Sequence, residues 1–121
     1  MTPRTTLVKT TLLGPYPALQ PAANALDVTF AAADLSGAKN QFAPSGDDLL
    51  LVWNTDVATP YTFTLTSAVD DKNRTGDITT YSVGAGEIAA IRVKIQGWTQ
   101  TDGKVYLEAS NVAIKFAVIG L

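Results

Sequence analysis

Asp48-Leu49-Leu50-Leu51-Val52-Trp53-Asn54, followed after a turn by Tyr61-Thr62-Phe63-Thr64-Leu65-Thr66-Ser67, is the stretch of sequence that decides the fold. In its second half apolar side chains alternate with hydroxyl side chains, which is the side-chain period of a half-buried β-strand. Its first half is apolar on both faces, as in a strand at the middle of a sheet whose outer face is also covered. Asn54-Thr55-Asp56 and Thr59-Pro60 supply turn residues between the two halves. The stretch therefore predicts two strands of one hairpin.

Strand-like segments continue on both sides of this pair. Residues 36–47 are predicted to form a loop, with Phe42 plugging the edge of the sheet, whereas residues 31–35 fit either a strand extension or one helical turn. Gly84-Ala85-Gly86 predicts a hairpin turn, and Asp102-Gly103 is a second strong turn signal. Short apolar or alternating runs predict further strands at residues 7–13, 26–30, 78–83, 87–95, 104–108 and 113–119.

The total of about eight short strands without a convincing helix predicts an all-β fold, a single antiparallel β-sandwich. A chain of 121 residues is long enough to bury one core without disulfides or metals. The long connection between Phe30 and Asp48 favours a jelly roll over an immunoglobulin-like sandwich, whose Cys-Trp-Cys pattern is missing. We place the sandwich domain at residues 26–121, after an extended N-terminal arm at residues 1–25.

The arm differs from the rest of the chain in its prolines, which force extended or turn conformations and remove backbone donors. Two interpretations stay open: a frayed terminus with a weak edge strand, or an extended segment that lies on a neighbouring subunit. A stiff, partly apolar arm loses little entropy when it docks. Its candidate contact residues are Leu12, Leu13, Pro15, Tyr16, Pro17 and Leu19.

Composition limits the chemistry that this chain can perform. The 9 Lys and Arg residues against 11 Asp and Glu give no basic surface for phosphates, so nucleic acid is not expected as a partner. The chain has neither His nor Cys, the commonest general base and the usual soft metal ligands. No catalytic residue, cofactor or enzyme activity is therefore predicted. Residues 112–121, the longest apolar run, contain Lys115 and are too short to span a bilayer, so no membrane partner is expected.

Two groups of oxygen-bearing side chains are candidate sites. Asp71, Asn73, Thr75 and Asp77 partly match a calcium loop, but the position of its closing Glu is Ser82. A solvated loop is the favoured interpretation, with a calcium site as the alternative. The pairs Asp47 with Asp48 and Glu87 with Glu108 are the candidate acid and base pairs for glycoside cleavage, but neighbouring aspartates on a strand point to opposite faces.

Several short segments together resemble the small head proteins of tailed bacteriophages: Val52-Trp53-Asn54-Thr55, Arg74-Thr75-Gly76-Asp77-Ile78, Gly84-Ala85-Gly86-Glu87, Gly97-Trp98, Asp102-Gly103-Lys104-Val105-Tyr106-Leu107-Glu108 and Ile114-Lys115-Phe116-Ala117-Val118-Ile119. The resemblance implies a capsid decoration or cement protein that reinforces the shell without chemistry, often as a homotrimer. The implied partners are the major capsid protein and other copies of the chain. The implied location is the outer capsid surface of the virion, after synthesis in the bacterial host cytoplasm.

A non-catalytic carbohydrate-binding module is the alternative, because β-sandwiches often present aromatic rings to sugars. Trp98, Tyr61, Tyr81 and Tyr106 are the available rings. For Trp98 in its polar loop, a side chain folded back over the end of the sandwich is the favoured interpretation, with subunit contact and sugar binding as the alternatives. The two functions differ in what they require of the surface. A decoration protein needs an arm and one flat apolar patch, whereas a sugar binder needs exposed aromatic rings on a concave face.

Overall fold

The computed structural model describes residues 5–11, 23–24, 27–35, 39–68, 76–95 and 97–120. Over these residues the chain forms strands and turns and no helix. No described segment is therefore a helix of the length and apolarity that crossing a membrane requires. The strands are β1 (Thr5–Thr6), β2 (Lys9–Thr11), β3 (Ala31–Ala32), β4 (Asn40–Phe42), β5 (Asp47–Asn54), β6 (Tyr61–Thr66), β7 (Ile78–Val83), β8 (Ile88–Lys94), β9 (Val105–Ala109) and β10 (Ile114–Gly120).

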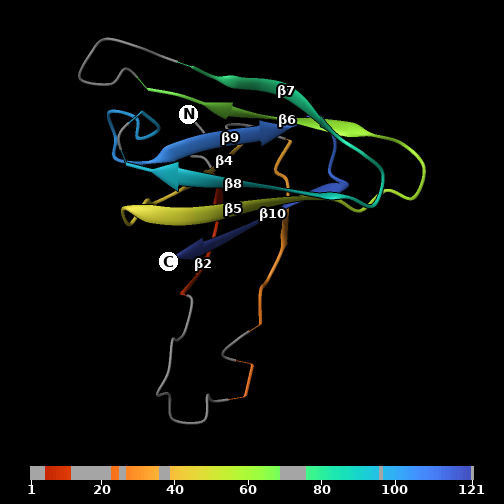
Figure 1. Ribbon diagram of the computed structural model, residues 1–121, viewed down its shortest axis with the longest axis horizontal. Coiled ribbons are helices and arrows are strands. Elements are labelled where there is room, and N and C mark those ends of the chain that lie inside the picture. Colours follow the sequence, from red (N-terminus) through yellow and green to blue (C-terminus); the bar gives the residue numbers. More distant parts are fainter. Residues whose placement is uncertain are drawn as a thin grey trace.

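The strands form two packed sheets, which confirms the predicted β-sandwich (Figure 1). Sheet A has the order β1-β4-β9-β6-β7, and sheet B the order β2-β10-β5-β8 with β3 also paired to β10. The buried side chains between the sheets are mostly aliphatic, with Phe42, Phe63 and Phe116 as the aromatic members. One core therefore serves both sheets.

Strand β5 lies in the middle of sheet B, between β10 and β8, as the sequence predicts. Its burial alternates at every residue. Leu50 and Val52 are fully buried in the core, whereas Leu49, Leu51 and Trp53 are half-buried on the outer face. The doubly apolar run therefore has one side in the core and one side on the surface of the sandwich.

The predicted hairpin of β5 with β6 is wrong, because the two strands belong to different sheets. The turn at Gly84-Ala85-Gly86 likewise joins β7 of sheet A to β8 of sheet B, so it is not a hairpin turn. Strands β6 and β7 are consecutive strands that do pair. An alternating pattern fixes which face of a strand is buried, but either sheet of a sandwich satisfies it.

The first described residues of the predicted arm lie inside the sandwich. Strand β1 pairs with β4 and β2 pairs with β10, and both pairings are parallel. The chain crosses from sheet A to sheet B between them, and Leu7 at the crossing is buried in the core. Both sheets are therefore mixed, so the prediction of a purely antiparallel sandwich is wrong at these two pairs.

Two further local predictions are corrected by the structure. Residues 27–30 carry no strand; the strand here is β3, at Ala31–Ala32. Strand β4 falls in a predicted loop, and its Phe42 is fully buried inside the core instead of at a sheet edge. A strand of this length shows no alternation, and β4 forms because β1 and β9 supply backbone partners on both sides.

Buried polar side chains tie the sheets to their loops. Asn54, at the end of β5, donates from Nδ2 to the carbonyl oxygens of Thr59 at 2.9 Å and Val83 at 3.0 Å. Its Oδ1 accepts the backbone N–H of Asp56 at 3.0 Å. Since Val83 ends β7, this amide joins sheet B to sheet A and fixes the predicted turn after β5.

A second buried group, the carboxylate of Asp48, holds β2 against the centre of sheet B. It is fully buried and lies 2.9 Å from Nζ of Lys9. Ser45 donates to it from its backbone N–H at 2.9 Å and from its hydroxyl at 2.7 Å. Gly120 lies between the two strands, and a Cβ there would be 3.1 Å from the Lys9 side chain. Because Gly120 has no side chain, the Lys9 side chain can pass over it and reach the Asp48 carboxylate.

Replacing Asp48 with alanine should lower the free energy of unfolding by about 3–5 kcal/mol, because it leaves the partly buried Lys9 ammonium without its partner. Urea unfolding at neutral pH measures this loss. The matched control is Asp47→Ala, which removes a surface carboxylate from the neighbouring position and should leave the unfolding midpoint nearly unchanged. Equal midpoints for the two variants would contradict the role of Asp48.

Acid should destabilise the fold through the same carboxylate. Burial raises the pKa of Asp48, but the hydrogen bonds from Ser45 and the Lys9 charge outweigh it, so this pKa lies below its ordinary value. The ionised form therefore stabilises the folded chain above about pH 4, where the unfolded chain titrates, and this contribution is lost as pH falls through the lower folded pKa. Urea midpoints measured from pH 7 downward should fall less steeply in Asp48→Asn than in the wild-type chain. If the urea midpoint of Asp48→Asn fell with pH as steeply as that of the wild-type chain, this prediction would be wrong.

Candidate interaction surfaces

The two outer faces of the sandwich differ sharply in chemistry. On sheet A the outward side chains are hydroxyl, amide and carboxylate groups, and on sheet B the centre of the outer face is apolar. The register places seven side chains together on sheet B, which we call the apolar face: Leu49, Leu51 and Trp53 of β5, Ile88 and Ala90 of β8, and Ala117 and Ile119 of β10. The corresponding polar set on sheet A is Thr6, Gln41, Thr62, Thr64, Thr66, Ser82, Tyr106 and Glu108.

The apolar face becomes more exposed toward strand β8, at the edge of sheet B. Ala117 and Ile119 are buried, the β5 side chains are half-buried, and Ala90 is exposed. Ile88 is 56% exposed, a high value for an isoleucine. The exposed part of the apolar face is therefore at β8, where another molecule packing on the sheet edge would cover it.

Charged side chains border the apolar face at both ends of β5, where Lys115 lies opposite Trp53 and Arg92 lies opposite Leu49. Arg92 donates to the Asp47 carboxylate through Nε and Nη2, both at 2.6 Å, and Lys94 lies 3.8 Å away. The hydrogen bond from Arg92 holds the pKa of Asp47 below its ordinary value. Asp47 thus faces outward while Asp48 faces the core, so the two aspartates point to opposite faces, as the sequence predicts.

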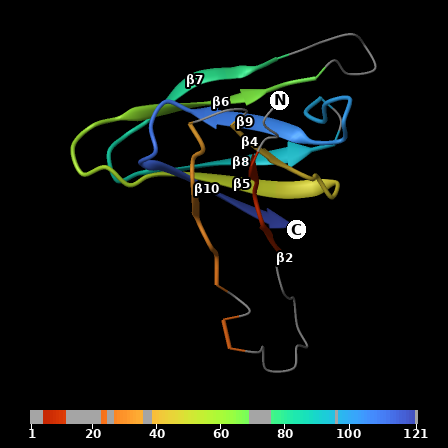
Figure 2. The ribbon, with the colours of Figure 1, turned by 180° about the vertical axis from the view of Figure 1, so that it is seen from behind.

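The described residues on either side of the predicted boundary between arm and domain form a segment that projects from the sandwich beside sheet B. In both views the described residues 23–24 and 27–29 lie beyond the strands (Figure 1, Figure 2), and all of them are exposed. Phe30 then meets the apolar face, where its ring packs edge-on against Trp53 with centroids 5.3 Å apart. The projecting segment is therefore anchored next to the apolar face.

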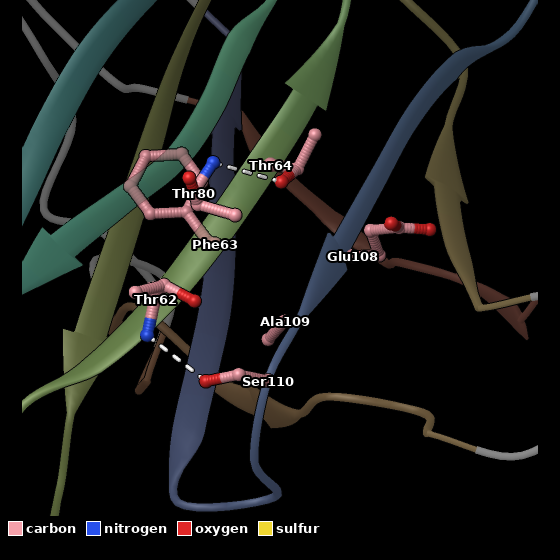
Figure 3. Close-up of a pocket in the computed structure, with 7 residues that line it drawn as sticks. All are labelled: Thr62, Phe63, Thr64, Thr80, Glu108, Ala109 and Ser110. Carbon is pink, nitrogen blue, oxygen red and sulfur yellow. Dashed lines mark hydrogen bonds between the residues drawn. The ribbon is translucent and has the colours of Figure 1, made fainter.

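The described residues also form two hollows, the larger of which adjoins the apolar face at Ile88 and Ala90. One has a volume of about 400 Å³ and lies between the edge strands β7 and β8, where it is lined by Ile78, Tyr81, Ile88 and their neighbours. The other has a volume of about 150 Å³ and lies on sheet A (Figure 3). Its lining residues are Thr62, Phe63, Thr64, Thr80, Glu108, Ala109 and Ser110.

The structure describes one of the predicted contact residues. Trp98 is half-buried and packs against the core, so its ring covers the end of the sandwich. The other predicted contacts, Leu12, Leu13, Pro15, Tyr16, Pro17 and Leu19, lie outside the described residues.

Most of the predicted calcium loop, residues 69–75, also lies outside the described residues. Of the described ligand candidates, Asp77 accepts hydrogen bonds from the backbone N–H and the hydroxyl of Ser67, both at 2.8 Å. These bonds hold its pKa below the ordinary value. Among the described residues no cluster of three or more acidic side chains could hold a metal ion.

The sequence alone did not predict the apolar face of sheet B or the hollow on sheet A, although it contained a signal for the apolar face. The doubly apolar run at residues 49–53 indicates a covered outer face, and the apolar face is what surrounds it. The hollow on sheet A depends on which strands become neighbours, and the alternating threonines of β6 were the available signal.

Comparison of the chain with protein-family models, with curated proteins and with solved structures finds no match. Its function is therefore argued from the surfaces described above.

Replacing Phe30 with alanine should uncover Trp53 and lower the free energy of unfolding by about 1 kcal/mol, since an aromatic pair is lost. In a Trp98→Phe background Trp53 is the single tryptophan, and its fluorescence should shift to longer wavelength in the folded protein. Val28→Ala, at an exposed position of the same segment, is the control. An unchanged emission maximum would show that Phe30 does not cover Trp53.

Proposed function

We propose that this chain is a structural protein of a virus particle, a capsid decoration or cement protein that binds and reinforces a bacteriophage head as a homotrimer. The observation that carries the proposal is the apolar face of sheet B. Its proposed partners are other copies of the chain and the major capsid protein, and its place is the outer surface of the virion. The role is mechanical, with no enzymatic step.

The apolar face supports self-association because its exposed part lies at the edge strand β8. Ile88 and Ala90 would be covered when a neighbouring subunit packs there, and the Asp47, Arg92 and Lys94 charges would form a polar rim. The projecting segment starts from the same side of the sandwich, where Phe30 contacts Trp53. A neighbour on this face would therefore meet both the sheet and the projecting segment. The proposed contacts in the arm, Leu12, Leu13, Pro15, Tyr16, Pro17 and Leu19, stay a prediction from the sequence.

The aromatic rings give less support to the carbohydrate-binding module as first predicted. Trp98 and Tyr61 pack against the core, and the hydroxyl of Tyr106 donates to Asp102 at 2.5 Å. Tyr81, at 54% exposed, lies over Phe63 with ring centroids 5.7 Å apart. Of the four predicted rings one is exposed, so they do not form a stacking platform together.

The test compares two substitutions that add the same charge to opposite faces. Ala90→Asp puts a carboxylate at an exposed outward position of edge strand β8, on the apolar face. Ser82→Asp does the same on edge strand β7, on sheet A. Light scattering should give three times 12.8 kDa for the wild-type chain and Ser82→Asp, and the monomer mass for Ala90→Asp with unchanged circular dichroism.

The same three proteins are then added to purified phage heads that lack the decoration protein, and bound protein is measured after sedimentation. Wild type and Ser82→Asp should co-sediment, and Ala90→Asp should remain in solution because a buried unpaired carboxylate is costly. If Ala90→Asp and Ser82→Asp had the same solution mass and bound heads equally, the apolar face would not be the contact surface. A wild-type chain that neither associates nor binds heads would overturn the decoration role itself.

A further inference from the structure

The small hollow on the outer face of sheet A is formed where three strands meet around a break in the β-ladder. Strands β6 and β7 pair through Phe63 with Tyr81 and through Leu65 with Ile78, so two residues of β7 oppose the single residue Thr64. This is a β-bulge, a feature that often lies next to functional sites. The hollow opens beside it, between β7, β6 and β9 (Figure 3).

The bulge holds Thr80 in a backbone conformation that its side chain disfavours. Its φ angle is 48°, in the left-handed region, where a β-branched residue is a genuine outlier. The backbone N–H of Thr80 donates to the Thr64 hydroxyl at 3.0 Å, which fixes both residues at the rim of the hollow. Strain of this kind is typically retained at sites where a particular arrangement of groups is needed.

The hydroxyl groups in the hollow are arranged as donors. The Thr64 hydroxyl accepts the N–H of Thr80, and the Ser110 hydroxyl accepts the N–H of Thr62 at 3.0 Å. Because a backbone donor already occupies one lone pair of each oxygen, the hydroxyl hydrogens are available to a ligand. Two pre-positioned O–H donors therefore lie close together, one on β6 and one directly after the end of β9.

Glu108 supplies the complementary acceptor. It is directly opposite Thr64 in the register and is half-buried. Among the described residues it makes no hydrogen bond or ion pair, so its oxygens can accept from a ligand. Phe63 and Ala109 complete the lining with apolar atoms. Because Phe63 is 4% exposed and belongs to the core, the hollow combines two donors and one strong acceptor with little exposed apolar surface.

We propose that this hollow binds one neutral sugar ring. Sugar hydroxyls donate and accept, so hydroxyls of one ring can donate to Glu108 and accept from Thr64 and Ser110. A volume of about 150 Å³ is small beside the usual pockets for larger ligands and suits a single ring. An anion would be repelled by Glu108, and a single carboxylate is a poor site for a metal ion.

The inference does not rest on capsid binding, because it uses the face of the sandwich opposite to the apolar face. If both hold, a decorated particle would present sugar-binding sites on sheet A while sheet B makes the subunit contacts. If the decoration role fails, the hollow can still bind a sugar in an isolated chain. The two proposals therefore fail separately.

The experiment is a titration of the full ¹⁵N-labelled chain with the methyl glycosides of glucose, galactose, mannose and N-acetylglucosamine, followed by two-dimensional NMR. At least one glycoside should shift the amide signals of Thr62, Thr64, Thr80 and Ser110 in a saturable manner. Glu108→Gln should weaken this binding by about tenfold, because a charged hydrogen-bond acceptor becomes a neutral one. Glu87→Gln, which removes the same charge from the exposed turn after β7, should bind like the wild-type chain.

The spectra themselves show whether each variant is folded. Absence of shifts with all four glycosides up to about 100 mM would overturn the proposal, since binding weaker than this is not specific recognition. Shifts centred on Tyr81 or Trp98, or equal affinity in Glu108→Gln, would also overturn it. Methylammonium chloride serves as the probe for a lysine-like cation, and equal shifts of the same four amides by this salt would assign the hollow to a cation instead of a sugar.

Discussion

A carboxylate that faces the interior of a sandwich is stable only with partners, and the partners of Asp48 determine how this chain closes. Two hydrogen bonds come from Ser45, close in sequence, but the charge comes from Lys9 on strand β2. The ammonium reaches the carboxylate across β10, over Gly120, where no side chain stands in the way. Strand β2 is consequently held in sheet B by an ion pair with its central strand as well as by backbone pairing with β10.

Sequence periodicity was sufficient to locate most of the longer strands but not to pair them. The alternation in Tyr61–Thr66 and the doubly apolar run in Asp47–Asn54 correctly indicated a half-buried strand and a central strand. Their pairing failed because the connection between them crosses from one sheet to the other, and both sheets offer the same apolar core. The short strands β1, β3 and β4 have no internal pattern; they exist because neighbouring strands offer backbone partners.

The apolar face of sheet B and the hollow on sheet A were predictable to different degrees, because periodicity shows which residues of one strand share a face but not which strands are neighbours. Apolar residues at alternate positions of β5 already implied that the outside of sheet B is covered, although the side chains contributed by β8 and β10 required the register. The hollow on sheet A joins Thr64, Thr80 and Glu108 from three strands, and it depends on one extra residue in β7 that no periodicity reveals. The packing of Trp98 against the core follows its favoured interpretation, because a ring of this size in a polar loop gains more by folding back than by staying in water.

The parallel pairing of β2 with β10 joins residues 9–11 to residues 118–120, nearly the two extremes of the described chain. During synthesis on the ribosome the first of these segments must therefore wait for the last, and sheet B stays incomplete while its apolar side chains are already made. The local pairing of β6 with β7 has no such delay. Closure of the sandwich is consequently a late, long-range event, which places this protein among slow-folding β-structures and leaves its unfinished chain dependent on protection from premature association.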